Sequence, residues 1–337
     1  MSFNTPILFI IFNRLDTTKE VFSKIRAIKP KQLFISADGP RIDRIGENEL
    51  CDSVKEYVEA NIDWECSVYR KYNYRNVGCK IAISSAIDWI FSVVDNAIIL
   101  EDDCVPEESF FYFSEQMLAR YKNDNQVMMI SGTNYLIEVK EYEYDYFFSN
   151  YFAIWGWATW KRAWLKYDIK MKSWPQYRIE NKLADYIQDE KIIEQYKEMF
   201  DHAYKNEINT WDIQWFYSCL FCNGVTIVPV KNQVSNIGII GTHTGNEISK
   251  FNYMRTIALE KKYYTGNPKI SVDQELNNKI LSVIYSVNNC IDIKINESRL
   301  SSHILNRLRK VGKLLKNNGL INLFTLLKKR LSKGKRE

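Results

Sequence analysis

Three consecutive carboxylates, Glu101, Asp102 and Asp103, directly follow a short apolar run at residues 97–100. Adjacent carboxylates repel one another, so they persist where solvent, a cation or hydrogen-bond donors offset the repulsion. The apolar run predicts a buried strand, and Pro106 prevents a helix from following at once. The acids therefore lie at the carboxyl end of a strand, where ligands bind in open α/β sheets. Carboxylate oxygens there suit a divalent cation that bridges to phosphate, and a solvated acidic loop is the alternative.

Polar residues stand at three other junctions between a predicted strand and a predicted helix. The stretches are Phe12-Asn13-Arg14, Asp38-Gly39-Pro40-Arg41 and Asn76-Val77-Gly78-Cys79-Lys80. Each one alone could be a turn or a helix cap, but four such junctions on one rim are what a nucleotide site on a parallel sheet requires. Neither G-x-G-x-x-G nor G-x-x-x-x-G-K-S/T occurs, so phosphate has to be neutralised by other groups.

The elements that must position these residues follow from the hydrophobic pattern. Apolar runs alternate with amphipathic stretches over the first hundred residues, which is typical of a sheet built from βαβ units. The predicted strands are residues 7–12, 32–37, 65–70, 97–100 and 127–131, and the predicted helices are 17–28, 47–61, 80–94 and 109–121. An aromatic-rich stretch at 142–164 then breaks the alternation. Beyond it we expect a helix at 181–205 and a strand at 225–230.

Composition indicates a globular protein with a large core. Hydrophobic residues make up 46% of the 337 residues and aromatic residues 14%, which excludes a disordered or collagenous chain. We expect no secretory signal and no membrane span, because the early apolar run is short and no run reaches about 18 apolar residues. Seven cysteines favour reduced thiols in the cytoplasm. Cys219 and Cys222 form a single C-x-x-C, for which two buried thiols are a better interpretation than zinc ligands.

The positive charge of the chain is concentrated in its last forty residues. Residues 298–337 hold twelve Lys or Arg and one acid, a net charge of +11, while residues 1–297 hold 34 basic and 40 acidic residues, a net charge of −6. Large apolar residues recur among these cations at helical spacing, so we predict a basic amphipathic helical tail that binds an anionic membrane surface rather than nucleic acid. Residues 251–297 are expected to form a helical connector to this tail.

Taken together, these motifs resemble a known family, the nucleotide-diphospho-sugar glycosyltransferases of the GT-A fold. Bacterial family 2-like enzymes are the nearer resemblance and N-acetylglucosaminyltransferase I is a more distant one. Besides the four junctions, the resemblance rests on Trp155-Gly156-Trp157 with Trp160, on Trp211-Asp212 with Trp215, and on Thr242-His243-Thr244. It implies a Rossmann-like α/β fold with a mixed, mainly parallel sheet flanked by helices over residues 1–250. Residues 1–135 would be the nucleotide-sugar half and residues 136–250 the acceptor half.

The resemblance also implies roles for individual residues. Asp103 would bind Mn²⁺ or Mg²⁺ with His243 near the metal or the diphosphate, Asp102 would face the ribose or donor sugar, and Asp212 would be the catalytic base. The triplet is E-D-D where the family has a D-x-D-type element. Asp38 would recognise uracil and Arg14 would contact the nucleotide or diphosphate. The remaining predicted nucleotide-sugar contacts are Asn13, Asn76, Lys80, Glu101 and Trp157.

The implied activity is a metal-dependent inverting transfer of a sugar from a nucleoside-diphosphate sugar, UDP-linked by expectation, to a hydroxyl. The acceptor would be a glycan or a lipid-linked saccharide in bacterial surface polysaccharide synthesis, at the cytoplasmic face of the cell membrane. Two alternatives remain open. A catalytically inactive fold could bind a glycan or a membrane. A sugar-nucleotide pyrophosphorylase would need a Gly-rich, Arg-containing loop after the first strand, where this chain has Phe12-Asn13-Arg14-Leu15-Asp16.

Overall fold

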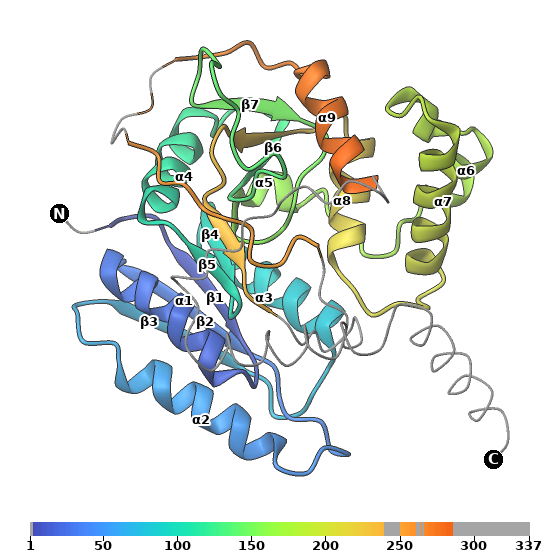
Figure 1. Ribbon diagram of the computed structural model, residues 1–337. Helices are drawn as coiled ribbons and strands as arrows, with labels where there is room; N and C mark the ends of the chain where they lie inside the picture. The colour runs from blue at the N-terminus through green and yellow to red at the C-terminus, as the bar shows by residue number, and fades with distance from the viewer. Residues whose placement is uncertain (1–2, 239–249, 261–263, 265, 286–337) are drawn as a thin grey trace, which may run out of the picture. The chain divides into compact units, whose positions relative to one another are not determined.

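The computed structural model describes residues 3–238, 250–260, 264 and 266–285, which belong to one compact unit, residues 1–293. Within these residues an eight-stranded mixed sheet is flanked by helices (Figure 1). The predicted α/β fold with a mainly parallel central sheet is confirmed. None of the described helices combines the length and the apolar character that crossing a bilayer requires.

The central sheet has the strand order β3-β2-β1-β4-β8-β6-β9-β7. Its strands are β1 (Ile7–Ile11), β2 (Gln32–Ala37), β3 (Ser67–Tyr72), β4 (Asn96–Glu101), β6 (Val127–Ser131), β7 (Tyr146–Ser149), β8 (Trp157–Trp160) and β9 (Val225–Pro229). Strands β1 to β4 are mutually parallel, and β8 enters antiparallel between β4 and β6. The strand order reverses at β1, which has β2 on one side and β4 on the other. Ligands bind in open α/β sheets at the crevice that such a reversal creates.

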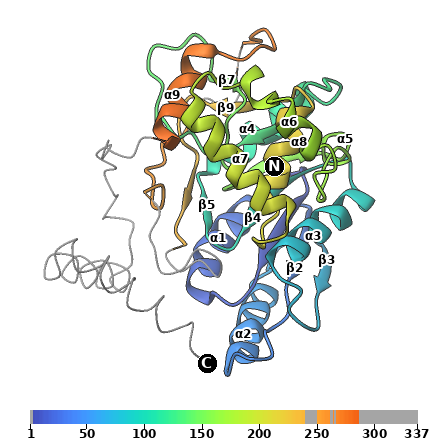
Figure 2. The same cartoon turned by 90° about the vertical axis from the view of Figure 1, so that its right-hand side faces the viewer.

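Strands β1 and β4 are apolar at nearly every position. Helices therefore cover both faces of the sheet at these two strands. In β1, Ile7, Phe9 and Ile11 pack into the core beneath α1 (Leu15–Ile28) and α2 (Glu47–Ala60). Leu8 and Ile10 pack instead beneath α3 (Cys79–Val93). Figure 2 shows α1 and α3 on opposite sides of these strands. Successive side chains of a strand point to opposite faces of the sheet, which explains why alternate residues of β1 pack against different helices.

From residue 108 onwards, the described part of the chain consists of helices, loops and short strands. Its helices are α4 (Glu108–Arg120), α5 (Lys161–Trp164), α6 (Trp174–Ile179), the 3-10 turn η1 (Lys182–Asp185), α7 (Glu190–Tyr204), α8 (Asp212–Phe221) and α9 (Gln274–Tyr285). The helix predicted at residues 181–205 is therefore divided. Asp189 ends the connecting loop and accepts the backbone N–H groups of Lys191 and Ile192, so it caps a new helix start.

A small second sheet joins β5 (Cys104–Pro106) to β10 (Val234–Asn236) in antiparallel register. Asn236 lies opposite Cys104, so the chain that leaves β10 passes the acidic triplet at the end of β4. The backbone N–H of Ile237 donates to the carbonyl of Asp103 at 2.8 Å. A segment more than a hundred residues downstream is thereby held against the carboxylates.

Candidate active site

A cavity of about 500 Å³ opens where the strand order reverses. Most of its wall comes from the four junctions that the sequence singles out. The lining residues are Ile10, Ile11, Phe12, Arg14, Ser36, Asp38, Arg41, Asn76, Gly78, Cys79, Ala82, Ile83, Glu101, Asp102, Asp103, Ile154, Trp155, Asn209 and Asn236. Six predicted site residues therefore meet at one cavity: Arg14, Asp38, Asn76, Glu101, Asp102 and Asp103. Its volume lies within the range of about 300–1,000 Å³ that is usual for small-molecule sites.

One arginine faces the acidic triplet. Arg14, which immediately precedes α1, pairs through Nη2 with Asp102 and through Nη1 with Asp103 Oδ2 at 2.7 Å. The Arg14 carbonyl accepts the Thr18 hydroxyl at 2.6 Å, which ties this residue to the first turn of α1. Burial, followed by the charges of Asp103 and Asp102, raises the pKa of Glu101 to about 8. Burial also raises the pKa of Asp102, and the Arg14 charge opposes that effect.

Asp102 and Asp103 could supply part of the ligand shell of a divalent cation. Asp102 Oδ2 is buried and has no hydrogen-bond partner among the described residues, and one guanidinium faces three acids. Among those residues no group of three His, Cys, Asp or Glu is placed to hold a metal by itself. Mg²⁺ and Mn²⁺ commonly take one or two carboxylates and complete their shell with water and substrate phosphates. His243, the other predicted metal residue, lies outside the described residues.

Asp38 lines the cavity, but its carboxylate is largely engaged by the protein itself. Oδ1 accepts the backbone N–H groups of Gly39 at 2.9 Å and Val77 at 3.1 Å and the Asn73 amide at 3.0 Å. Oδ2 accepts the N–H groups of Val77 and Gly78, both at 3.2 Å. Asp38 thus fastens the β3–α3 loop to the end of β2. Recognition of uracil by Asp38 stays a prediction, and it would compete with these bonds.

Two predicted contacts lie behind the cavity wall instead of lining it. The Asn13 amide donates to Glu47 Oε1 at 2.9 Å, and Glu47 also holds Arg41, which does line the cavity. Lys80 is buried, and its ammonium donates to Asn206 Oδ1 at 2.8 Å. Asn13 therefore supports the wall through Glu47 and Arg41, while the Lys80 side chain contacts a residue that does not line the cavity.

Trp157 requires a correction. Its side chain is 1% exposed, stacks on Trp211 at 5.6 Å and is absent from the cavity lining. Trp157 begins β8, so its side chain points into the apolar layer beneath α3. Two positions earlier, before the turn at Gly156 (φ 65°), Trp155 lines the cavity. The Trp-Gly-Trp pattern indicates an aromatic at the site but does not distinguish the two tryptophans.

Thirteen further lining residues were not predicted as site residues, among them Arg41, Cys79 and Asn209. Arg41 and Cys79 lie within two of the strand–helix junctions described above, and this position is the sequence feature that could have identified them as lining residues. Asn209 comes from the segment before α8, and its Oδ1 accepts the backbone N–H of Lys80 at 3.0 Å, in the first turn of α3. No local pattern reveals Asn209, because its contact spans 129 positions of the chain.

Asp212 lies in a second cavity of about 200 Å³ that adjoins the first. Ile154 and Trp155 line both cavities, so this pair forms a shared wall. Asp212 Oδ1 accepts the Thr210 hydroxyl and the backbone N–H of Ile213, the latter at 2.9 Å. Asp212 is the first residue of α8, so its contact with the helix start and its exposure to the cavity coexist.

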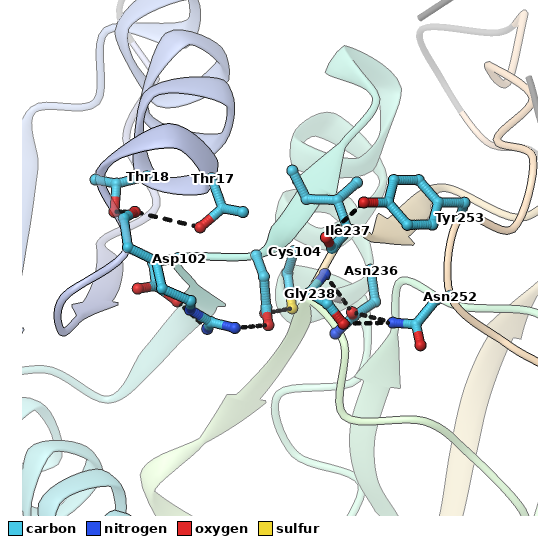
Figure 3. Close-up of polar contacts among 11 residues, drawn as sticks. Thr17, Thr18, Asp102, Cys104, Asn236, Ile237, Gly238, Asn252 and Tyr253 are labelled. Atoms are coloured by element: carbon cyan, nitrogen blue, oxygen red, sulfur yellow. Dashed lines mark hydrogen bonds and ion pairs between the residues drawn. The ribbon is translucent and has the colours of Figure 1, made fainter. Parts of the chain in front are cut away.

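The segment after β10, with Ile237 and Gly238, lies beside Cys104 (Figure 3). Asn236 Oδ1 accepts the backbone N–H of Gly238 at 2.9 Å and the Asn252 amide at 2.8 Å, and the same amide donates to the Gly238 carbonyl at 3.0 Å. A Cβ on Gly238 would lie 2.2 Å from Asp103 Oδ2. Main chain therefore approaches this carboxylate as closely as a glycine allows.

Comparison with known proteins yields structural likenesses, and those described below are distant. No family model matches the sequence, and no curated protein matches it. A mannosyltransferase from Pyrobaculum calidifontis, solved with GDP-mannose and Mn²⁺, is 12% identical at a TM-score of 0.30, over 46% of this chain and 44% of its own. An apo UDP-glucose pyrophosphorylase is 10% identical at a TM-score of 0.33, over 68% of this chain and 93% of its own. At these scores the likenesses carry no argument about function, which has to come from the site.

Proposed function

We propose that the chain is a glycosyltransferase that moves a sugar from a nucleoside-diphosphate sugar, in the first instance a UDP-sugar, to a hydroxyl group. The observation that carries this proposal is the pair of adjoining cavities. One holds two arginines and four carboxylates at the switch point of the sheet, and the other holds Asp212. A donor and an acceptor must meet at a single reacting carbon, and two cavities with a shared wall at Ile154 and Trp155 provide that arrangement.

The first cavity would bind the donor. Asp103, supported by Asp102, would hold Mg²⁺ or Mn²⁺, which would stabilise the negative charge on the departing nucleoside diphosphate. Arg14 fixes both carboxylates in place through its two ion pairs. The β3–α3 loop, fastened by Asp38, brings the start of α3 to the cavity, where its first backbone N–H groups favour an anion.

The second cavity would activate the acceptor. Asp212 Oδ1 is occupied by the Thr210 hydroxyl and the Ile213 N–H, which leaves Oδ2 to accept the proton of an attacking hydroxyl. The hydroxyl oxygen then forms the new bond to the anomeric carbon as the bond to the diphosphate breaks. Attack from the side of the second cavity, opposite the diphosphate, would invert the configuration of that carbon.

Binding of nucleotides tests this proposal directly. Melting temperatures are measured with UDP, GDP, CDP and their common sugar conjugates, with and without Mn²⁺. A ligand at 100 times its Kd stabilises a protein by about 2.7 kcal/mol, which such a scan resolves. We expect a Mn²⁺-dependent shift that Asp103→Ala removes and that the matched control Asp185→Ala, whose carboxylate side chain is 61% exposed on η1, retains.

Two outcomes would refute the proposal. One is the absence of a shift with any nucleotide or nucleotide sugar, which would favour a non-catalytic binding module. The other is formation of a sugar nucleotide from a sugar phosphate and a nucleoside triphosphate with release of pyrophosphate, which would identify a pyrophosphorylase.

A further inference from the structure

The second cavity is lined mainly by aromatic side chains, with one carboxylate among its described lining residues. Its lining comes from the chain before β8, from α7 and α8 and from the end of α9. The residues are Tyr135, Tyr151, Phe152, Ala153, Ile154, Trp155, Tyr196, Met199, Asp212, Ile213, Phe216, Ile284 and Tyr285. Aromatic side chains make up seven of these thirteen positions, and Asp212 is the one charged side chain among them.

The rings are held in place by one another. Tyr196 stacks on Phe216 with centroids 5.3 Å apart and planes 16° apart, and Tyr151 stacks on the same Phe216 at 6.3 Å. Tyr135 meets Trp155 edge-on at 6.1 Å. Rings packed in this way keep their faces and edges in place before a ligand arrives, so little conformational entropy is lost on binding. The C–H faces of a sugar ring suit such a surface, because aromatic faces are apolar and electron-rich.

The charge of the cavity excludes an anionic ligand. Among the described lining residues there is no Lys, Arg or His, and Asp212 would repel a phosphate or a carboxylate. Burial, with a contribution from the Asp212 charge, raises the pKa of Tyr135, so its hydroxyl keeps its proton and can donate a hydrogen bond. The ligand best matched to this lining is neutral and carries hydroxyl groups.

The volume limits how much of the ligand can enter. About 200 Å³ is below the roughly 300–1,000 Å³ of cavities that enclose a drug-sized molecule. One ring can enter, while an oligosaccharide or a lipid chain would have to remain outside.

We propose that this aromatic cavity binds a single neutral sugar ring, which presents the acceptor hydroxyl to Asp212, and that lipid phosphates are not acceptors. This inference rests on the proposed function and names the acceptor class of the same site. An acceptor attached to a lipid would then be recognised through a sugar already joined to that lipid.

The experiment observes sugars directly by saturation-transfer NMR. The probes are the methyl glycosides of glucose, galactose, mannose and N-acetylglucosamine, with octyl phosphate as the lipid-phosphate probe, each in the presence of UDP and Mg²⁺. We expect saturation of the C–H protons of at least one glycoside and none of octyl phosphate. Tyr135→Ala, which removes an aromatic edge, should weaken glycoside binding roughly tenfold.

A filling variant and a control separate loss of the cavity from loss of the fold. Ile213→Trp adds bulk at a half-buried lining position and should abolish the glycoside signal. Tyr177→Ala removes a half-buried tyrosine of α6 that lines neither cavity and should leave the signal unchanged. Melting curves identify any variant that fails to fold.

The outcomes are distinguishable from those that test the proposed function. The acceptor inference is overturned if UDP binds while no glycoside shows saturation transfer. It is also overturned if the glycoside saturation signal survives Ile213→Trp in a folded protein. Saturation of octyl phosphate that Tyr135→Ala removes would assign the cavity to a lipid phosphate and overturn it as well. Glycoside binding without any nucleotide binding would refute the transferase function and leave a sugar-binding cavity.

Discussion

Asp38 has a structural role in addition to its place in the lining of the first cavity. Five hydrogen bonds from Gly39, Asn73, Val77 and Gly78 end on its two oxygens. Gly78 has a φ of 83°, and a Cβ there would lie 2.5 Å from the Asn209 amide, so the start of α3 is tightly constrained on both sides. The carboxylate therefore determines where the first backbone N–H groups of α3 lie.

Asp38→Asn tests whether this residue recognises uracil or anchors the β3–α3 loop. An amide places one N–H₂ donor against backbone N–H donors, so we expect a loss of about 1–3 kcal/mol in the free energy of unfolding. UDP, CDP and GDP should lose affinity by similar factors. Melting curves and calorimetric titrations measure both effects, with Asp43→Asn, in the exposed β2–α2 loop, as the control. Selective loss of UDP affinity at an unchanged melting temperature would instead assign uracil recognition to Asp38.

We propose that Asp212 acts in the chemical step more than in binding the donor. Its contribution to the raised pKa of Glu101, after burial and the charges of Asp103 and Asp102, indicates that the two cavities interact electrostatically. Asp212→Asn keeps the oxygen that accepts from Thr210 and Ile213 and removes the proton acceptor. Turnover should fall by about 10²–10⁴-fold, the usual contribution of a general base, while nucleotide affinity is retained.

Steady-state kinetics measure the turnover, and titrations of the same preparation measure the nucleotide affinity. Asp185→Asn serves as the control at an exposed carboxylate. A variant that keeps its turnover but loses nucleotide affinity would place Asp212 in donor binding.

Among the elements, the small β5–β10 sheet has the most direct effect on the acidic triplet. It brings Gly238 against Asp103, and the Asn236–Asn252 contact holds it there. In Gly238→Ala the new methyl group would displace the Asp103 carboxylate, because the contact of 2.2 Å is far below any real Cβ separation. We expect Mn²⁺-dependent nucleotide binding to weaken by about tenfold or more, the equivalent of 1.4 kcal/mol.

Gly46→Ala is the matched control for this substitution. No atom lies within 4 Å of the position of its added Cβ, although its φ is 80°, so it should lose some stability and no nucleotide affinity. Equal nucleotide affinity in Gly238→Ala and the wild type would show that the segment after β10 does not position Asp103.

The helices and strands differ in how well the local hydrophobic pattern predicts them. Strands β1 to β4 and helices α1 to α3 lie within a few residues of their predicted bounds. Each of these segments contains the apolar pattern that is typical of its own type of element. The strands β5, β7, β8 and β10 were not predicted. They are three or four residues long and exist because distant partners pair with them, as Cys104 does with Asn236. The aromatic-rich stretch that breaks the pattern contains β7 and β8.

The candidate site divides in the same way. Arg14, Asp38, Asn76 and the acidic triplet could be predicted because parallel strands bring successive junctions to one edge. Asn209 and Asn236 could not, since their positions depend on how the second half of the chain packs on the first. Trp157 was predicted wrongly as a nucleotide-sugar contact because the register of β8, set by its pairing with Ile99 and Ser131, turns this side chain inward.

At the scale of the whole molecule, charge separates the chain into two unlike parts. Residues 1–297 carry −6 and residues 298–337 carry +11. The described cavities hold carboxylates and two arginines, each paired with an acid, so nothing in them accounts for the basic residues near the end of the chain. The membrane-binding tail lies outside the described residues and remains a proposal from composition alone.

Deleting residues 298–337 tests that proposal. Each Lys or Arg near an anionic surface contributes about 1 kcal/mol, and interleaved apolar residues add shallow insertion. We expect the full chain to sediment with phosphatidylglycerol vesicles and not with phosphatidylcholine vesicles, and to be released by salt, because screening shortens the reach of the charges. The truncated chain should stay in the supernatant while keeping its Mn²⁺-dependent nucleotide binding and any hydrolysis of the sugar nucleotide. Vesicle binding that survives the deletion would assign the membrane contact to residues 1–297, whose net negative charge makes such a contact electrostatically unfavourable.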